Sequence, residues 1–254
     1  RRLCTISFAR KVSRKRSRRD REPRDDLALE GSSGRVMDDD DDDDALPEGS
    51  PVVGSLDVVP SRSAVLQACT VTSGLIAALG IIIRQVSHVA SVEGFPVPDC
   101  STEVSFGIEV WHLELILGLV ILISSCRYLL LKIWPEFSES TEASNQQVLA
   151  SLQPSDYLVI SFLPGISEEL LFRGALQPLF GMDWKSVFPI AILFGVLHLG
   201  SGRKSSFAIW ATFVGAVYGY ATISSSSIIV PMAAHALNNL AGGILWRYKS
   251  KPLD

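Results

Sequence analysis

The sequence predicts an all-α fold, a polytopic transmembrane helical bundle with a disordered N-terminal tail. Three observations lead to this prediction. Apolar residues gather in long blocks after Ala64, the blocks have the length of membrane-spanning helices, and Lys and Arg collect at alternate ends of them. The net charge of −4 averages a polar tail and an apolar remainder, so it says little about partners.

Residues 1–60 are almost entirely polar and are predicted to be a disordered tail, basic at first and then acidic. Residues 1–24 contain eleven Arg or Lys against two acids, with several Ser and Thr, which is typical of the end of an organelle transit peptide. A nucleic-acid-binding arm is the alternative on charge alone, but no folded module accompanies it, so no nucleic-acid partner is predicted. The Asp run 38–44 cannot pack and is predicted to be a solvated spacer.

Six stretches are long and apolar enough, or nearly so, to cross a bilayer as helices of about 20 residues. They cover residues 64–83, 108–131, 157–177, 186–200, 206–222 and 228–246. Residues 61–133 therefore form two N-terminal transmembrane helices, 134–156 a polar connection, 157–247 a four-helix core and 248–254 a C-terminal tail.

The distribution of Lys and Arg near the span ends predicts the orientation. With the N-terminus on the positive side, that side collects Arg62, Arg127, Lys132, Arg203, Lys204, Arg247, Lys249 and Lys251. The opposite side collects only Arg84 and Lys185. Six spans place both termini on the positive side, which is the stroma in a plastid and the cytosol in other membranes.

The third predicted span contains three charged residues, Glu168, Glu169 and Arg173, although a charge at mid-bilayer costs about 2.5–3.5 kcal/mol on insertion scales. Glu169 and Arg173 are four residues apart and are predicted to pair on one helical face. Glu168 lies about 100° around the helix and points elsewhere. Pro164 is predicted to kink the helix before the acids. A purely structural ion pair would explain Glu169 and Arg173 but not Glu168.

Two further spans contain polar residues at a similar depth. His198 is in the fourth span, and His235 and Asn239 are four residues apart in the sixth, on one face. At about 1.5 Å per residue from the less basic side, Glu168 and His198 lie about 13 and 18 Å deep. His235 and Asn239 lie about 11 and 17 Å deep by the same measure. Each could simply join two helices, but a shared layer favours a common site.

In order and helix placement, these residues resemble the three motifs of the CAAX protease and bacteriocin-processing family, which includes the type II CAAX prenyl endopeptidases. The motifs are Glu168-Glu169-x-x-x-Arg173, Phe194-x-x-x-His198 and His235-x-x-x-Asn239. The resemblance covers about residues 150–247, and the N-terminal composition favours a plant plastid member.

The resemblance implies an intramembrane endopeptidase. Its catalytic residues would be Glu168, Glu169, Arg173, His198, His235 and Asn239. Glu168 and His198 would activate the attacking water, while His235 and Asn239 would donate to the developing oxyanion. The set Glu168, His198 and His235 could instead hold Zn²⁺ with an open position for water, as in a metalloprotease. The sequence leaves this mechanism and a metal-free glutamate mechanism equally open.

The implied substrate is a membrane-embedded or membrane-anchored protein or peptide, with the lipid bilayer as the surrounding medium. The alternative is a non-proteolytic plastid scaffold, since some plant proteins that resemble this family regulate chlorophyll metabolism through protein partners. Intact motifs favour the enzyme, whereas the charged tail is compatible with a scaffold. Either would lie in a chloroplast membrane, thylakoid or envelope, with both termini in the stroma. A transporter is disfavoured because the polar residues form one cluster without an inverted repeat.

Overall fold

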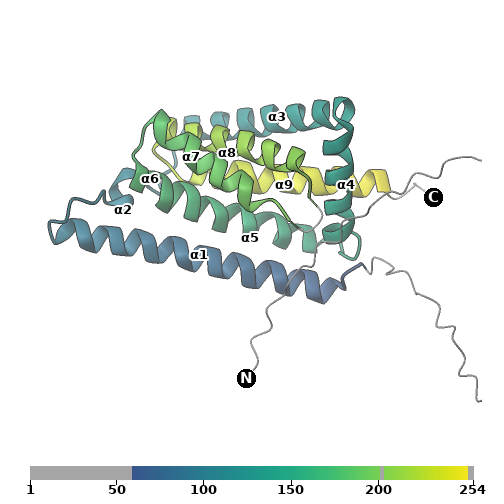
Figure 1. Ribbon diagram of the computed structural model, residues 1–254, viewed down its shortest axis with the longest axis horizontal. Helices are drawn as coiled ribbons and strands as arrows, with labels where there is room; N and C mark the ends of the chain where they lie inside the picture. Colours follow the sequence, from purple (N-terminus) through teal and green to yellow (C-terminus); the bar gives the residue numbers. More distant parts are fainter. Residues whose placement is uncertain (1–58, 201–202, 251–254) are drawn as a thin grey trace, which may run out of the picture. The chain divides into compact units, whose positions relative to one another are not determined.

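The computed structural model describes residues 59–200 and 203–250, and this part of the chain is built from helices (Figure 1). In chain order they are α1 Arg62–Val92, α2 Cys100–Glu103, α3 Val110–Ile133, α4 Pro135–Leu149, α5 Asp156–Leu171, a π-helical segment η1 Phe172–Leu176, α6 Gln177–Phe180, α7 Trp184–Leu197, α8 Ser205–Ser225 and α9 Ile229–Ser250. Within the described residues the only strand-like pairing is two isolated bridges, so the predicted all-α class is confirmed. The predicted tail lies almost wholly outside the described residues, as do 251–254.

Three of the described helices, α1, α3 and α8, are long and apolar enough to cross a membrane. They correspond to the predicted spans 64–83, 108–131 and 206–222, although α3 begins and ends two residues later than predicted. Helix α7 is apolar, but its 14 residues extend only about 21 Å, against about 30 Å of bilayer hydrocarbon. Helices α5 and α9 contain the acidic, imidazole and amide groups that lower their hydropathy. The bundle is confirmed, while its predicted number of six spans is not.

Large apolar side chains cover the outward faces of the long helices. On α1 alone the exposed ones are Val71, Leu75, Leu79, Ile81, Ile82, Val86, Val89 and Val92. A contiguous apolar surface of this kind promotes association in water, whereas lipid tails solvate it. The outward faces of the bundle are therefore suited to lipid.

The connection 134–156 contains a helix that the apolar pattern did not predict. Helix α4 lies across the ends of the other helices (Figure 1). Its Glu139 accepts a hydrogen bond from Lys204 Nζ at 2.7 Å, just before α8 begins. Its Glu142 accepts hydrogen bonds of 3.0 Å from the Trp246 indole near the end of α9. Helix α4 therefore covers the end of the bundle where α8 begins and α9 ends.

Helix α1 packs along α5 and is fastened at two levels. Gly80 permits the close approach, because a Cβ there would lie 3.1 Å from the α5 backbone. Near the start of α1, Arg62 donates two hydrogen bonds of 2.6 Å to Asp156. Farther along, the buried Arg84 guanidinium donates to the Gly174 carbonyl oxygen in η1. The first helix is thus packed together with the four-helix core.

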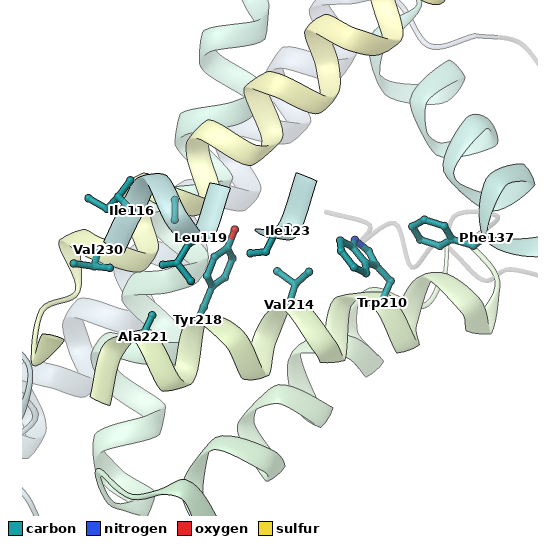
Figure 2. Packing of buried hydrophobic residues seen from close by; sticks show 10 residues of the cluster. Ile116, Leu119, Ile123, Phe137, Trp210, Val214, Tyr218, Ala221 and Val230 are labelled. Atoms are coloured by element: carbon teal, nitrogen blue, oxygen red, sulfur yellow. The ribbon is translucent and has the colours of Figure 1, made fainter. Parts of the chain in front are cut away.

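A buried apolar cluster joins α3, α4, α8 and α9 (Figure 2). Its members are Ile116, Leu119, Ile123, Phe137, Trp210, Val214, Tyr218, Ala221, Val230 and Ala234. Tyr218 is fully buried, and its ring also stacks on the motif residue His235 of α9. This cluster therefore supports the layer in which the polar residues meet.

Candidate active site

The motif residues of the three predicted helices converge in the structure. Glu168 and Glu169 lie on α5, His198 is the C-terminal cap of α7, and His235 lies on α9. Helices α5 and α9 approach closely at Gly165, where a Cβ would lie only 2.8 Å from the backbone nitrogen of Ala236 in α9. This crossing brings the acids of α5 within hydrogen-bonding reach of α9.

Glu169, Arg173 and His235 form one buried network. Arg173 Nη1 donates to Glu169 Oε1 at 3.0 Å, and both side chains have no exposed surface, so the predicted ion pair forms. His235 Nδ1 donates to the same Oε1 at 2.8 Å. Glu169 thus binds His235 as well as Arg173, and the i,i+4 spacing did not predict this second contact. One carboxylate fixes both the arginine and the imidazole ring.

Glu168 points away from the Glu169–Arg173 pair, as its position around the helix predicted, and faces the other nitrogen of His235. Its Oε2 lies 4.0 Å from His198 Nε2 and 4.0 Å from His235 Nε2, beyond hydrogen-bonding distance of either. Oε2 is buried and has no hydrogen-bond partner in the described protein. A buried carboxylate oxygen without a donor is costly, so this atom requires a proton donor or a cation.

The Nδ1 atom of each imidazole is hydrogen-bonded to another group of the protein. His198 Nδ1 lies 2.7 Å from the carbonyl oxygen of Phe194, one turn earlier on α7. Since a carbonyl can only accept, His198 Nδ1 must bear the hydrogen, and Nε2 of the neutral ring offers a lone pair toward Glu168. His235 Nδ1 is similarly taken by Glu169. Both Nε2 atoms therefore face Glu168 and make no hydrogen bond within the described part of the chain.

A π-helical segment follows the acids directly, and the kink at Pro164 stays a prediction. Helix α5 continues through Pro164, and the π-helical η1 begins at Phe172. Such segments are rare and often occur at functional sites. In and just after η1, Arg173 Nη2 donates to Gly215 O at 2.8 Å and Gln177 Nε2 donates to Gly219 O at 3.2 Å. These two bonds fix the π-helical turn to α8.

A cavity of about 550 Å³ extends from the imidazoles to α4. His198, His235 and Asn239 line it together. Asn239 therefore reaches the same space as His235, as its spacing predicted. Asn238 also lines the cavity, and it makes structural bonds: its Oδ1 accepts from Ser124 Oγ at 2.9 Å, and its Nδ2 donates to Ala234 O at 3.0 Å.

Two aromatic side chains hold the imidazoles in place. The Tyr218 ring stacks on the His235 ring with centroids 5.3 Å apart, and its hydroxyl accepts from Asn238 Nδ2 at 3.1 Å. The Phe194 ring lies 4.5 Å from the His198 ring and 4.7 Å from the Arg173 guanidinium carbon. Phe194 was part of a motif, but Tyr218 was missed because an aromatic residue in an apolar helix is usually packing.

The predicted zinc ligands fit a metal only approximately. Ligand atoms at about 2.0–2.2 Å in a tetrahedral site lie about 3.4 Å apart, whereas Glu168 Oε2 is 4.0 Å from each imidazole Nε2. Among the described residues no group of three or more His, Cys, Asp or Glu is placed to hold a metal ion. Zinc ligation by Glu168, His198 and His235 stays a prediction.

Together, the apolar helices and the buried Glu–His cluster define an integral membrane protein with a polar site inside its helical bundle. Residues 150–241 match the family model described as type II CAAX prenyl endopeptidase Rce1-like, so the family resemblance drawn from the three motifs is confirmed for this segment.

Over 83 residues the chain is 40% identical to a Bacillus subtilis (strain 168) protein named "Uncharacterized protein YyaK". The alignment covers 29% of this chain, which spans 27% of the length of that relative. No solved structure matches the chain.

Proposed function

We propose that the chain is an intramembrane endopeptidase that hydrolyses a peptide bond of a membrane-embedded or membrane-anchored substrate, with a water activated by Glu168 and His198. The observation that supports this most is the position of Glu168 Oε2, which is buried, has no hydrogen-bond partner among the described residues, and lies 4.0 Å from two imidazole nitrogens. The family match over residues 150–241 supports the class of reaction.

The 4.0 Å separation between Glu168 Oε2 and His198 Nε2 is suited to a bridging water. A water about 2.8 Å from each atom would make two hydrogen bonds at about 90° to one another. Glu168 Oε2 and the Nε2 of neutral His198 are both acceptors, so the water would donate to both. Its oxygen lone pairs are then free to attack a carbonyl carbon, and Glu168 takes the proton and later passes it to the leaving amine.

Stabilisation of the tetrahedral intermediate is assigned to His235 and Asn239. The Glu169 carboxylate binds His235 Nδ1 and stabilises a protonated ring, whose Nε2–H then donates to the oxyanion. The Asn239 amide lines the same cavity and supplies a second donor. Arg173 acts through Glu169, holding that carboxylate against the ring.

The test is complementation of a null mutant with full-length variants. Glu168→Gln and His198→Ala should each fail to restore the phenotype at unchanged protein abundance. Glu142→Gln, which changes an acid on the cavity wall that is bonded to Trp246, is the matched control and should restore it. Full rescue by both site variants would reject the endopeptidase and favour a plastid scaffold that acts through protein partners, for example in chlorophyll metabolism.

We also propose a chloroplast membrane with both chain ends facing the stroma. Arg247 Nη1 donates to Leu152 O at 3.1 Å, and Arg62 binds Asp156, so the start of α1 and the end of α9 flank one end of the bundle. The basic residues near the span ends gather at this end. Cysteines introduced at Ser224 and Lys249, in a chain without its native cysteines, should label from opposite sides with an impermeant maleimide; labelling from one side would contradict the orientation.

A further inference from the structure

Arg127 is a charged residue within a candidate membrane span, and it has no partner in the described protein. It lies on α3, six residues before the helix ends at Ile133. Among residues 59–200 and 203–250 it has no hydrogen bond or ion pair, although it lines the cavity with His198 and His235. Charged residues within spans are usually paired or functional, so an unpaired Arg in a cavity suggests a ligand.

The guanidinium of Arg127 points into the bundle and does not extend out toward the membrane surface. Its Nη1 lies against the Cα of Gly242 on α9, where any Cβ would overlap it. The neighbouring Tyr128, in contrast, is exposed and receives Lys132 over its ring. Arg127 is therefore held between α3 and α9, and the absence of a side chain at position 242 leaves it room.

The remaining charges of the cavity wall are mostly positive. The lining cations are Arg127, Lys132, Arg203 and Lys249, and the one lining acid is Glu142. Arg203 donates from Nε to Ser144 Oγ at 3.1 Å and lies over the Phe207 ring, and no carboxylate of residues 59–200 or 203–250 forms an ion pair with it. A cavity with low-dielectric walls and this charge concentrates anions.

We propose that Arg127 is a specificity-determining residue that binds a carboxylate of the substrate in this cavity. Gly242, which Arg127 contacts, is seven residues after His235 on α9, a rise of about 10 Å. An extended peptide with its scissile bond at His235 can span that distance, and an Arg fork binds carboxylates well. Helix α3 lies outside residues 150–241, so the N-terminal helices contribute to substrate choice. This inference rests on the proposed endopeptidase function.

Binding can be measured without turnover in the full-length Glu168→Gln protein purified in detergent. The probes are three pools of mixed-sequence decapeptides: a free C-terminal carboxylate without acidic side chains, a C-terminal carboxamide without acidic side chains, and a carboxamide with one Asp or Glu. A preference for the first pool identifies a chain terminus as the source of the carboxylate, and a preference for the third identifies a side chain.

Adding Arg127→Gln should weaken binding of the preferred carboxylate pool about tenfold or more, with no change for the neutral carboxamide pool. Gly242→Ala keeps the charge but displaces the guanidinium, and it should weaken the same pool less. Lys185→Gln, at an exposed position where α7 begins, controls for a general loss of positive charge and should change neither.

Equal weakening of the neutral pool, or no preference among the three pools, would overturn the proposal. The proposal would also be overturned if Arg127→Gln changed only the amount of phosphatidylglycerol that co-purifies with the protein. Arg127 would then bind a lipid headgroup. The binding assay uses the Glu168→Gln variant and requires no hydrolysis. Its outcome can therefore be distinguished from a failure of the complementation test of the endopeptidase.

Discussion

Glu169 Oε1 lies 2.8 Å from His235 Nδ1 and 3.0 Å from Arg173 Nη1, so a single buried oxygen accepts from both α9 and η1. The adjacent Glu168 makes no such bond, and its Oε2 faces the two imidazole Nε2 atoms at 4.0 Å. Two neighbouring acids of one helix thus have separate tasks. Glu169 positions a ring, and Glu168 is free for the base role proposed above.

Substitution of the two acids should separate activity from stability. Glu168→Gln should abolish hydrolysis with little change in thermal unfolding, since Glu168 has no hydrogen-bond partner in the described protein. Glu169→Gln should abolish hydrolysis and lower the free energy of unfolding by roughly 3–5 kcal/mol, because it leaves the buried Arg173 charge unpaired. Thermal unfolding in detergent, together with complementation, measures both. Equal destabilisation by the two variants would contradict the separate tasks.

Tyr218 should support His235 through its ring more than through its hydroxyl. Tyr218→Phe removes the group that accepts from Asn238 and should cost about 1 kcal/mol of stability with most activity retained. Tyr218→Leu removes the aromatic face 5.3 Å from the His235 ring and should lower kcat about tenfold to a hundredfold by letting the ring move. Equal kcat values for the Phe and Leu variants would show that the stack does not position His235.

The parts of the site that depend on helical geometry were predictable from the sequence. The Glu169–Arg173 pair and the shared face of His235 and Asn239 follow from i,i+4 spacing, and the common layer follows from span depth. The Glu169–His235 bond was not predictable. It depends on how closely α5 and α9 approach at Gly165, which no local period encodes.

The helices, too, include some that the sequence predicted and some that it did not. The span 108–131 was predicted within two residues of α3, whereas α1 begins two residues before the predicted span 64–83 and ends nine residues after it. Helix α4 was missed because its polar residues resemble a loop when only apolar periodicity is considered. The number of spans was not confirmed because α7 is short and α5 and α9 contain the polar site. The polar residues of the candidate site therefore lower the hydropathy of the helices that contain them.

Two glycines of α1 test how that helix packs on α5. Gly80→Ala should destabilise the protein, because its Cβ would lie 3.1 Å from the backbone of α5 and one helix must shift. Gly74→Ala has open space around its Cβ and should be neutral, or slightly stabilising because Ala favours the helix. Thermal unfolding of the two variants compares them directly, and a similar loss in both would contradict the close α1–α5 approach at Gly80.

The Arg62–Asp156 ion pair that joins α1 to α5 should lose its stabilising effect in acid. Hydrogen bonds from Arg62 hold the pKa of the Asp156 carboxyl below its ordinary value of 3.8. A lowered folded-state pKa means that the stabilisation is complete above pH 3.8 and is lost as pH falls through the lowered pKa. The unfolding temperature of the Asp156→Asn variant should therefore fall less than that of the unaltered protein between pH 5 and about pH 2. If the unfolding temperatures of the two proteins fell in parallel with pH, the Arg62–Asp156 ion pair would contribute no pH dependence.

Chelation should leave hydrolysis intact. The 4.0 Å separations around Glu168 Oε2 exceed by about 0.6 Å the spacing that tetrahedral zinc imposes, but they suit a bridging water. Purified protein should therefore contain well under one zinc per chain and remain active after treatment with a chelator. The contrary outcome is equally definite: about one zinc per chain, lost with activity in both His198→Ala and His235→Ala, would establish the two-His, one-carboxylate metal site. Elemental analysis of the same preparations used for the activity measurement distinguishes the two mechanisms.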